Sequence, residues 1–123
     1  MPTIDELRAE AAQPVVIADQ WGIILQVNDA FAAFTGWKPA EIVGKPLTTI
    51  IPRRLHDAHN LGFSRFLATG APPVLGRPIK LNVMKSDGAE LDSEHYIVAE
   101  RQDGRWVFGA ILRPVEAAPS QDP

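Results

Sequence analysis

Apolar residues near the start of the chain recur at the spacing of one helix face. Ile4 and Leu7 lie about one helical turn apart, and Thr3 precedes Glu6 by three residues, which is the spacing of a capping box. We therefore expect residues 1–12 to form an N-terminal helix. Its apolar stripe is narrow, which is typical of a terminal helix that docks on another surface or another chain, as a dimerisation or signalling cap would.

Two short apolar runs, residues 15–18 and 23–27, lie on either side of a turn and predict a β-hairpin. Asn28 then stands at the position of a helix N-cap, and Gly36 at that of a helix C-terminus. Pro39 opens a further helical turn, since proline is favoured at the first position of a helix. The hairpin is therefore expected to lead into two short helices.

A longer helix is predicted over residues 53–69. Leu55, His59, Phe63 and Phe66 are spaced four, four and three residues apart, which places them on one face of this helix. Because apolar helix faces pack inward, we expect His59 to look into the interior with its apolar neighbours.

Three strands complete the chain, at residues 77–85, 90–100 and 106–114, with turns at Gly88 and Gly104. An α+β domain satisfies this order of elements if a five-stranded antiparallel sheet carries the short helices and the long helix on one face. The space between such a sheet and loosely packed helices is a natural pocket for a small molecule.

The composition narrows the class of protein. The chain has 123 residues, 46% hydrophobic and 22% charged, which suits one globular domain. The net charge of −3 argues against a dedicated nucleic-acid binder, and the lack of cysteine excludes disulfides and thiolate metal sites. No apolar run approaches the roughly 20 residues of a membrane span and there is no signal peptide, so we expect a cytoplasmic protein without membrane contact. Residues 116–123 are rich in Pro, Ala and polar residues and predict a flexible tail.

Several segments in a fixed order resemble one family. They are the run Asn-Asp-Ala-Phe at 28–31, the segment Phe-Thr-Gly-Trp-Lys-Pro-Ala-Glu-Ile-Val-Gly-Lys at 34–45, the turn at 85–88 and the closing strand at 104–113. On these residues the chain resembles a PAS domain, which we place at residues 13–115. The resemblance implies the PAS fold, in which a five-stranded antiparallel sheet carries helices on one face.

The resemblance also implies a sensory or interaction module. PAS domains bind haem, flavin, small metabolites or nothing, often dimerise, and pass strain to an effector. We expect a signal-sensing homodimer of a bacterial-type signal transduction system, with a histidine kinase or a diguanylate cyclase as its effector. The alternative is a ligand-free module for protein–protein interaction or dimerisation. The sequence has neither a catalytic-triad motif nor a phosphate-binding Gly-rich loop, so we expect no enzyme activity.

Haem b is one candidate ligand. Residues 59–66, His-Asn-Leu-Gly-Phe-Ser-Arg-Phe, are similar to a helix of the rhizobial oxygen-sensing haem PAS kinases. In those proteins a histidine is the proximal iron ligand and an arginine six residues later pairs with a haem propionate; the matching residues are His59 and Arg65. Neutral imidazole suits iron, and guanidinium suits a carboxylate. A lone helix histidine is also commonly a hydrogen-bonded core residue, so the choice of ligand stays open.

A second histidine lies on the predicted middle strand. His95 shares one strand face with Ser93 and Ile97, and this face is the better candidate for the inward one. His95 would then point into the pocket opposite His59 as a distal ligand of iron. The alternative is that His95 hydrogen-bonds Ser93 or a backbone group.

Ile79 departs from the oxygen-responsive haem relatives, in which the resemblance implies an arginine. Isoleucine can neither stabilise bound oxygen nor reach a propionate, so a haem-bound form would respond to CO, NO or redox state instead. Without haem, His59, Ser93 and His95 form a polar set among apolar walls, which suits a small organic acid or an aromatic molecule. The full predicted ligand-binding set is His59, Phe63, Arg65, Phe66, Ile79, Leu81, Ser93, His95 and Ile97.

Overall fold

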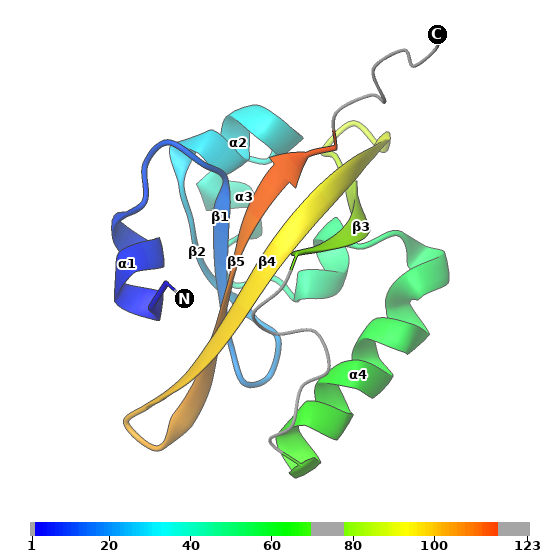
Figure 1. Cartoon of the computed structure of the whole chain (residues 1–123). Helices are drawn as coiled ribbons and strands as arrows, with labels where there is room; N and C mark the ends of the chain where they lie inside the picture. Colours follow the sequence, from blue (N-terminus) through cyan, green and yellow to red (C-terminus); the bar gives the residue numbers. More distant parts are fainter. Residues whose placement is uncertain (1, 70–77, 116–123) are drawn as a thin grey trace, which may run out of the picture.

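The computed structural model describes residues 2–69 and 78–115. Five strands form one antiparallel sheet in the order β2-β1-β5-β4-β3, which confirms the predicted sheet (Figure 1). The predicted tail at 116–123 and the predicted first residue of the third strand, Arg77, lie outside the described residues. The strands are β1 (Val15–Asp19), β2 (Ile24–Val27), β3 (Pro78–Met84), β4 (Glu90–Gln102) and β5 (Arg105–Pro114).

The segment between β2 and β3 supplies the helices on one face of the sheet (Figure 1). Asn28 caps the first of them by accepting a hydrogen bond from the backbone N–H of Phe31, and Gly36 ends it with a φ of 84°. The predicted long helix is an α-helix preceded by one 3-10 turn. The elements are α2 (Asp29–Thr35), α3 (Pro39–Ile42), the 3-10 helices η1 (Leu47–Ile50) and η2 (Arg53–Leu55), and α4 (His56–Thr69).

Helix α1 (Ile4–Ala9) begins with the predicted capping box but ends before residue 12. The carboxylate of Glu10 turns the chain, because it accepts hydrogen bonds from the backbone N–H groups of Ala12 and Gln13. Pro14 follows and disfavours a helical conformation at the residue before it. None of the helices in the described ranges combines the length and apolar character that a membrane crossing requires.

Helix α1 lies on the face of the sheet opposite α4, whereas the short helices and α4 share the other face, as predicted (Figure 1). Its apolar stripe docks on the sheet of its own chain. The close approach requires Gly109, since a Cβ there would lie 2.6 Å from Cδ1 of Leu7. This second core is formed by Ile4, Leu7, Val15, Ile17, Val98 and Val107.

Successive residues of the same strand face different cores. On β1, Val15 and Ile17 pack in the core beneath α1, whereas Val16 packs in the core beneath α2 and α3. On β4, Val98 faces α1 and Ile97 faces the opposite core. The sheet is therefore a layer shared by two cores, so a shift of one strand would change the packing in both cores.

Candidate functional site

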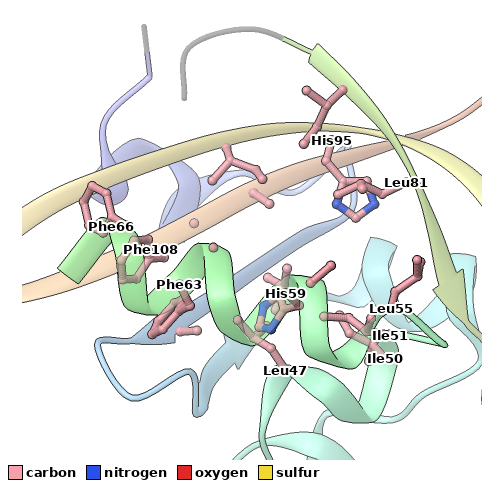
Figure 2. Close-up of a pocket in the computed structure, with 18 of the residues that line it drawn as sticks. Leu47, Ile50, Ile51, Leu55, His59, Phe63, Phe66, Leu81, His95 and Phe108 are labelled. Carbon is pink, nitrogen blue, oxygen red and sulfur yellow. The ribbon is translucent and has the colours of Figure 1, made fainter. Parts of the chain in front are cut away.

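A cavity of about 410 Å³ lies between α4 and the sheet (Figure 2). All four residues of the predicted helix face line the cavity: Leu55, His59, Phe63 and Phe66. Strands β1, β3, β4 and β5 supply the facing wall. The volume lies within the range of roughly 300–1,000 Å³ that is usual for small-molecule pockets.

The lining is almost entirely apolar. Among the described residues, its polar side chains are those of His59, Asn82 and His95, and no charged side chain takes part. Leu81 is 37% exposed and Gly62 is also exposed, so the cavity opens to solvent between β3 and α4. A charged ligand would therefore lose its hydration without meeting an opposite charge, which is costly.

His95 projects from β4, and its ring is directed toward α4 (Figure 2). Its Nε2 lies 2.6 Å from Oγ of Ser93, and the Ser93 hydroxyl donates to the backbone carbonyl of Leu81 at 3.1 Å. The residue is 9% exposed. Burial lowers the pKa of His95 to about 4, so its ring is neutral near pH 7.

His59 faces the cavity from α4 (Figure 2). Its Nδ1 lies 3.4 Å from the side-chain oxygen of Asn60, and its ring stacks on Phe63 with ring centroids 5.9 Å apart. Burial lowers the pKa of His59 below its ordinary value of 6.5. Each wall of the cavity thus presents one imidazole whose neutral form is favoured.

Helix α4 is fastened to the sheet near both of its ends. Arg54, just before the helix, donates hydrogen bonds from both terminal nitrogens to Glu90 at the start of β4. These bonds hold the pKa of the Glu90 carboxyl below its usual value. Toward the other end, Phe66 packs edge-on against Trp106 and Phe108, with ring centroids 4.7 and 5.0 Å apart. The cavity lies along the stretch of α4 between these attachments.

Two members of the predicted site lie outside the lining. Ser93 is buried and reaches the cavity only through its contact with His95. Arg65 follows His59 by six residues, or about 240° around the helix axis, so its exposed side chain lies on another face of α4. The structure brings the other members together around the cavity: His59, Phe63, Phe66, Ile79, Leu81, His95 and Ile97.

The sequence prediction missed the part of the lining that comes from η1 and the residue after it. Leu47, Ile50 and Ile51 line the cavity, and their spacing of three and one residues is that of a helical turn with one apolar face. Phe108 and Ala110 on β5 also line it. Their alternation with Gly109 was the available signal, because alternate strand residues share a face.

The residues present meet one of the two requirements of haem. His59 and His95 offer neutral imidazoles from opposite walls, and each has one ring nitrogen engaged, by Asn60 and Ser93 respectively, with the other left for iron. The two propionates need cationic partners, but no described lining residue is charged and Arg65 lies on another face. Haem binding is therefore supported by two candidate iron ligands, His59 and His95, but not by cationic partners for the propionates among the described lining residues.

The profile of the PAS domain family matches residues 12–115, which is most of the chain. The chain belongs to the PAS domain family. This membership supports a general sensory role, and the ligand of a PAS domain depends on the residues that line its cavity.

Known proteins similar to this PAS domain include one from Azorhizobium caulinodans, described as uncharacterised, that is 34% identical over 102 residues. The match covers 82% of this chain and 14% of that protein, so the PAS domain corresponds to one segment of a much longer relative.

Solved PAS domains share the fold. That of an HTR-like protein from Haloarcula marismortui has a TM-score of 0.69 at 21% identity, with 91% of this chain and 88% of that chain covered. That of the RpfR quorum-sensing receptor from Cronobacter turicensis, in complex with C12:0, has a TM-score of 0.65 at 17% identity, with 87% and 97% covered. At these identities the likeness shows the fold alone.

Proposed function

We propose that this PAS domain senses a small, mainly apolar molecule bound in the cavity between α4 and the sheet. The observation that carries the proposal is the cavity itself, with its volume of about 410 Å³ and its uncharged, largely apolar lining. A domain devoted to protein interaction alone would have no need of this space. Its core would close on Phe63 and Phe66, which here line the cavity without filling it.

The chemistry of the lining favours a neutral ligand with an aromatic or aliphatic body. Such a body would bury apolar surface against Phe63, Phe66 and Phe108, which is the main source of affinity in pockets of this kind. His95 and His59 would fix its orientation by hydrogen bonding. The PAS domain of the Cronobacter turicensis receptor, solved in complex with C12:0, offers a precedent on the same fold for a ligand with an aliphatic chain.

We propose further that the domain is a cytoplasmic, bacterial-type signalling module that acts as a homodimer and through an effector such as a histidine kinase or a diguanylate cyclase. The much longer Azorhizobium caulinodans relative supports this setting, because it contains a similar segment within a chain that has room for other domains. Strands β1, β4 and β5 would relay occupancy from the cavity to the face beneath α1, since they contribute to both.

The test is to block the mouth of the cavity and measure binding of an apolar fluorescent reporter, N-phenylnaphthylamine. Leu81→Trp places a large ring at the mouth, and Leu61→Trp is the matched control, because Leu61 is 54% exposed on α4 and lies outside the lining. We expect saturable binding to the wild type and to Leu61→Trp, and at least a tenfold loss in Leu81→Trp. Absence of binding to the wild type, or equal binding to both variants, would refute the proposal.

Haem b is a second candidate ligand, favoured by the two opposed imidazoles of His59 and His95. Hemin would be added to the wild type, His59→Ala and His95→Ala, and visible spectra recorded in the oxidised and reduced forms. A sharp Soret band that is lost in His59→Ala would support haem. Featureless hemin spectra in all three proteins would exclude it and leave the metabolite proposal standing.

A further inference from the structure

The pair of Ser93 and His95 fixes where the protons in the wall of the cavity lie. A serine hydroxyl has one hydrogen to donate and two lone pairs to accept with. The carbonyl oxygen of Leu81, 3.1 Å from Ser93 Oγ, can only accept, so both contacts of Ser93 are hydrogen bonds only if its hydrogen goes to this carbonyl. The Ser93 oxygen can then only accept from His95, whose Nε2 lies 2.6 Å away.

His95 therefore carries its proton on Nε2. A neutral imidazole has one donor and one acceptor nitrogen, so Nδ1 holds an unprotonated lone pair. Within the described part of the chain, the contact with Ser93 is the one hydrogen bond that the His95 ring makes. Its nitrogen-bearing edge is directed toward α4 across the cavity (Figure 2). His95 is 9% exposed, and its Nδ1 is an acceptor that none of the described residues partners.

A ligand that fills the cavity displaces water from Nδ1, and an acceptor left without a partner in the complex carries a free-energy cost. We propose that the ligand presents a hydrogen-bond donor, such as a hydroxyl or an N–H group on an apolar body, to Nδ1 of His95. This inference rests on the proposed function, because it specifies the ligand of the same cavity. Ser93 acts as a positioning residue: it does not touch the ligand, but it dictates which nitrogen of His95 accepts.

Other ligand classes fit this wall less well. An ionised carboxylate offers acceptors only, so it would face the lone pair of His95 and find no cation among the described lining residues. A ketone or an ether would likewise place an acceptor oxygen opposite the acceptor nitrogen Nδ1 of His95. Selectivity of this kind is strong because a mismatched ligand leaves two buried polar groups unpaired.

The test uses three probes of similar shape that differ in hydrogen bonding. Indole donates through its N–H group, its isostere benzofuran cannot donate, and indanone presents a carbonyl acceptor. Each would compete with N-phenylnaphthylamine for the wild-type domain. We expect indole to bind about tenfold more tightly than benzofuran or indanone, which is the upper end for one neutral hydrogen bond.

Two variants separate the hydrogen bond from the shape of the cavity. In His95→Phe, which keeps a ring but no acceptor, the preference for indole should vanish while reporter binding persists. In Ser93→Ala, His95 remains but either nitrogen can carry the proton, so the discrimination between indole and indanone should fall toward one. Leu61→Ala, outside the lining, should retain the wild-type preference.

The outcomes distinguish this inference from the proposed function. If the reporter does not bind the wild type, both fail. If the reporter binds but indole does not displace it, or indole and benzofuran bind equally, or indanone binds best, the inference on His95 is overturned and the cavity remains a binding site. Preference for indole that survives unchanged in Ser93→Ala would overturn the role of Ser93.

Discussion

His95 combines a polar ring with an almost fully buried position on β4. Its inward direction could be predicted from the sequence, because side chains alternate between the two faces of a strand. Its bond to Ser93 could not be chosen over a backbone partner in the same way. Residues two apart on a strand are about 6.5 Å apart, so the rotamers of both side chains decide whether they meet. That Arg65 lies outside the lining could not be predicted, because a matched motif fixes position along a helix but does not show which face the cavity occupies.

The buried ring of His95 predicts that the stability of the domain depends on pH. The pKa of His95 falls from 6.5 to about 4 on folding, so between these pH values the unfolded chain binds more protons than the folded one. Stability should therefore be lost as the pH falls from 6.5 to 4, by about 3 kcal/mol in total. Urea unfolding of the wild type and His95→Phe across this range would measure it. The variant should lack this part of the slope, and identical slopes would contradict the assignment.

The start of helix α1 is set by a local sequence signal, whereas its docking depends on a residue far away in the sequence. Its start was predictable, because the capping box needs only Thr3 and Glu6. Its end was not, because the carboxylate of Glu10 competes for the backbone groups that would continue the helix. Its docking site was not predictable either, since it depends on Gly109, about a hundred residues away in the sequence.

Matched glycine substitutions test the docking of α1. Gly109→Ala forces a Cβ to within 2.6 Å of Leu7, and we expect a loss of about 1–3 kcal/mol in the free energy of unfolding through overpacking. Gly62→Ala, inside α4 with nothing within 4 Å of the new Cβ, should gain roughly 0.5–1 kcal/mol from helix propensity. Urea unfolding of both variants measures this. A loss of stability in both, or in neither, would count against the packing described here.

The whole molecule is organised around a sheet whose strands serve two cores. Val107 of β5 packs beneath α1, whereas its neighbour Phe108 lines the cavity on the opposite face. The five antiparallel strands and the pocket between helix and sheet could be predicted from the sequence, because each strand carried its own turn and alternation signals, whereas the order of the strands was not predicted. That α1 completes a second core did not follow, because a narrow apolar stripe does not identify its partner.

This shared sheet predicts communication between its faces. Saturating the cavity with N-phenylnaphthylamine should change the hydrogen exchange of the α1 amides, although α1 does not contribute to the lining. The reason is that a shift of β5 moves both faces together. Leu81→Trp, with its mouth blocked, is the control and should show no change on adding the same reporter. Altered exchange confined to α4 and β3 in the wild type would show that the sheet does not relay occupancy.

The uncharged lining has a consequence for the conditions under which such a sensor works. Dissolved ions weaken interactions between charges, over a distance of about 8 Å at physiological ionic strength. The described lining residues hold no charge for them to screen. Occupancy should then follow the amount of ligand almost independently of salinity. At a given ligand concentration, the fraction of domains with an occupied cavity should therefore be the same in a cell in fresh water and in a cell in brackish water.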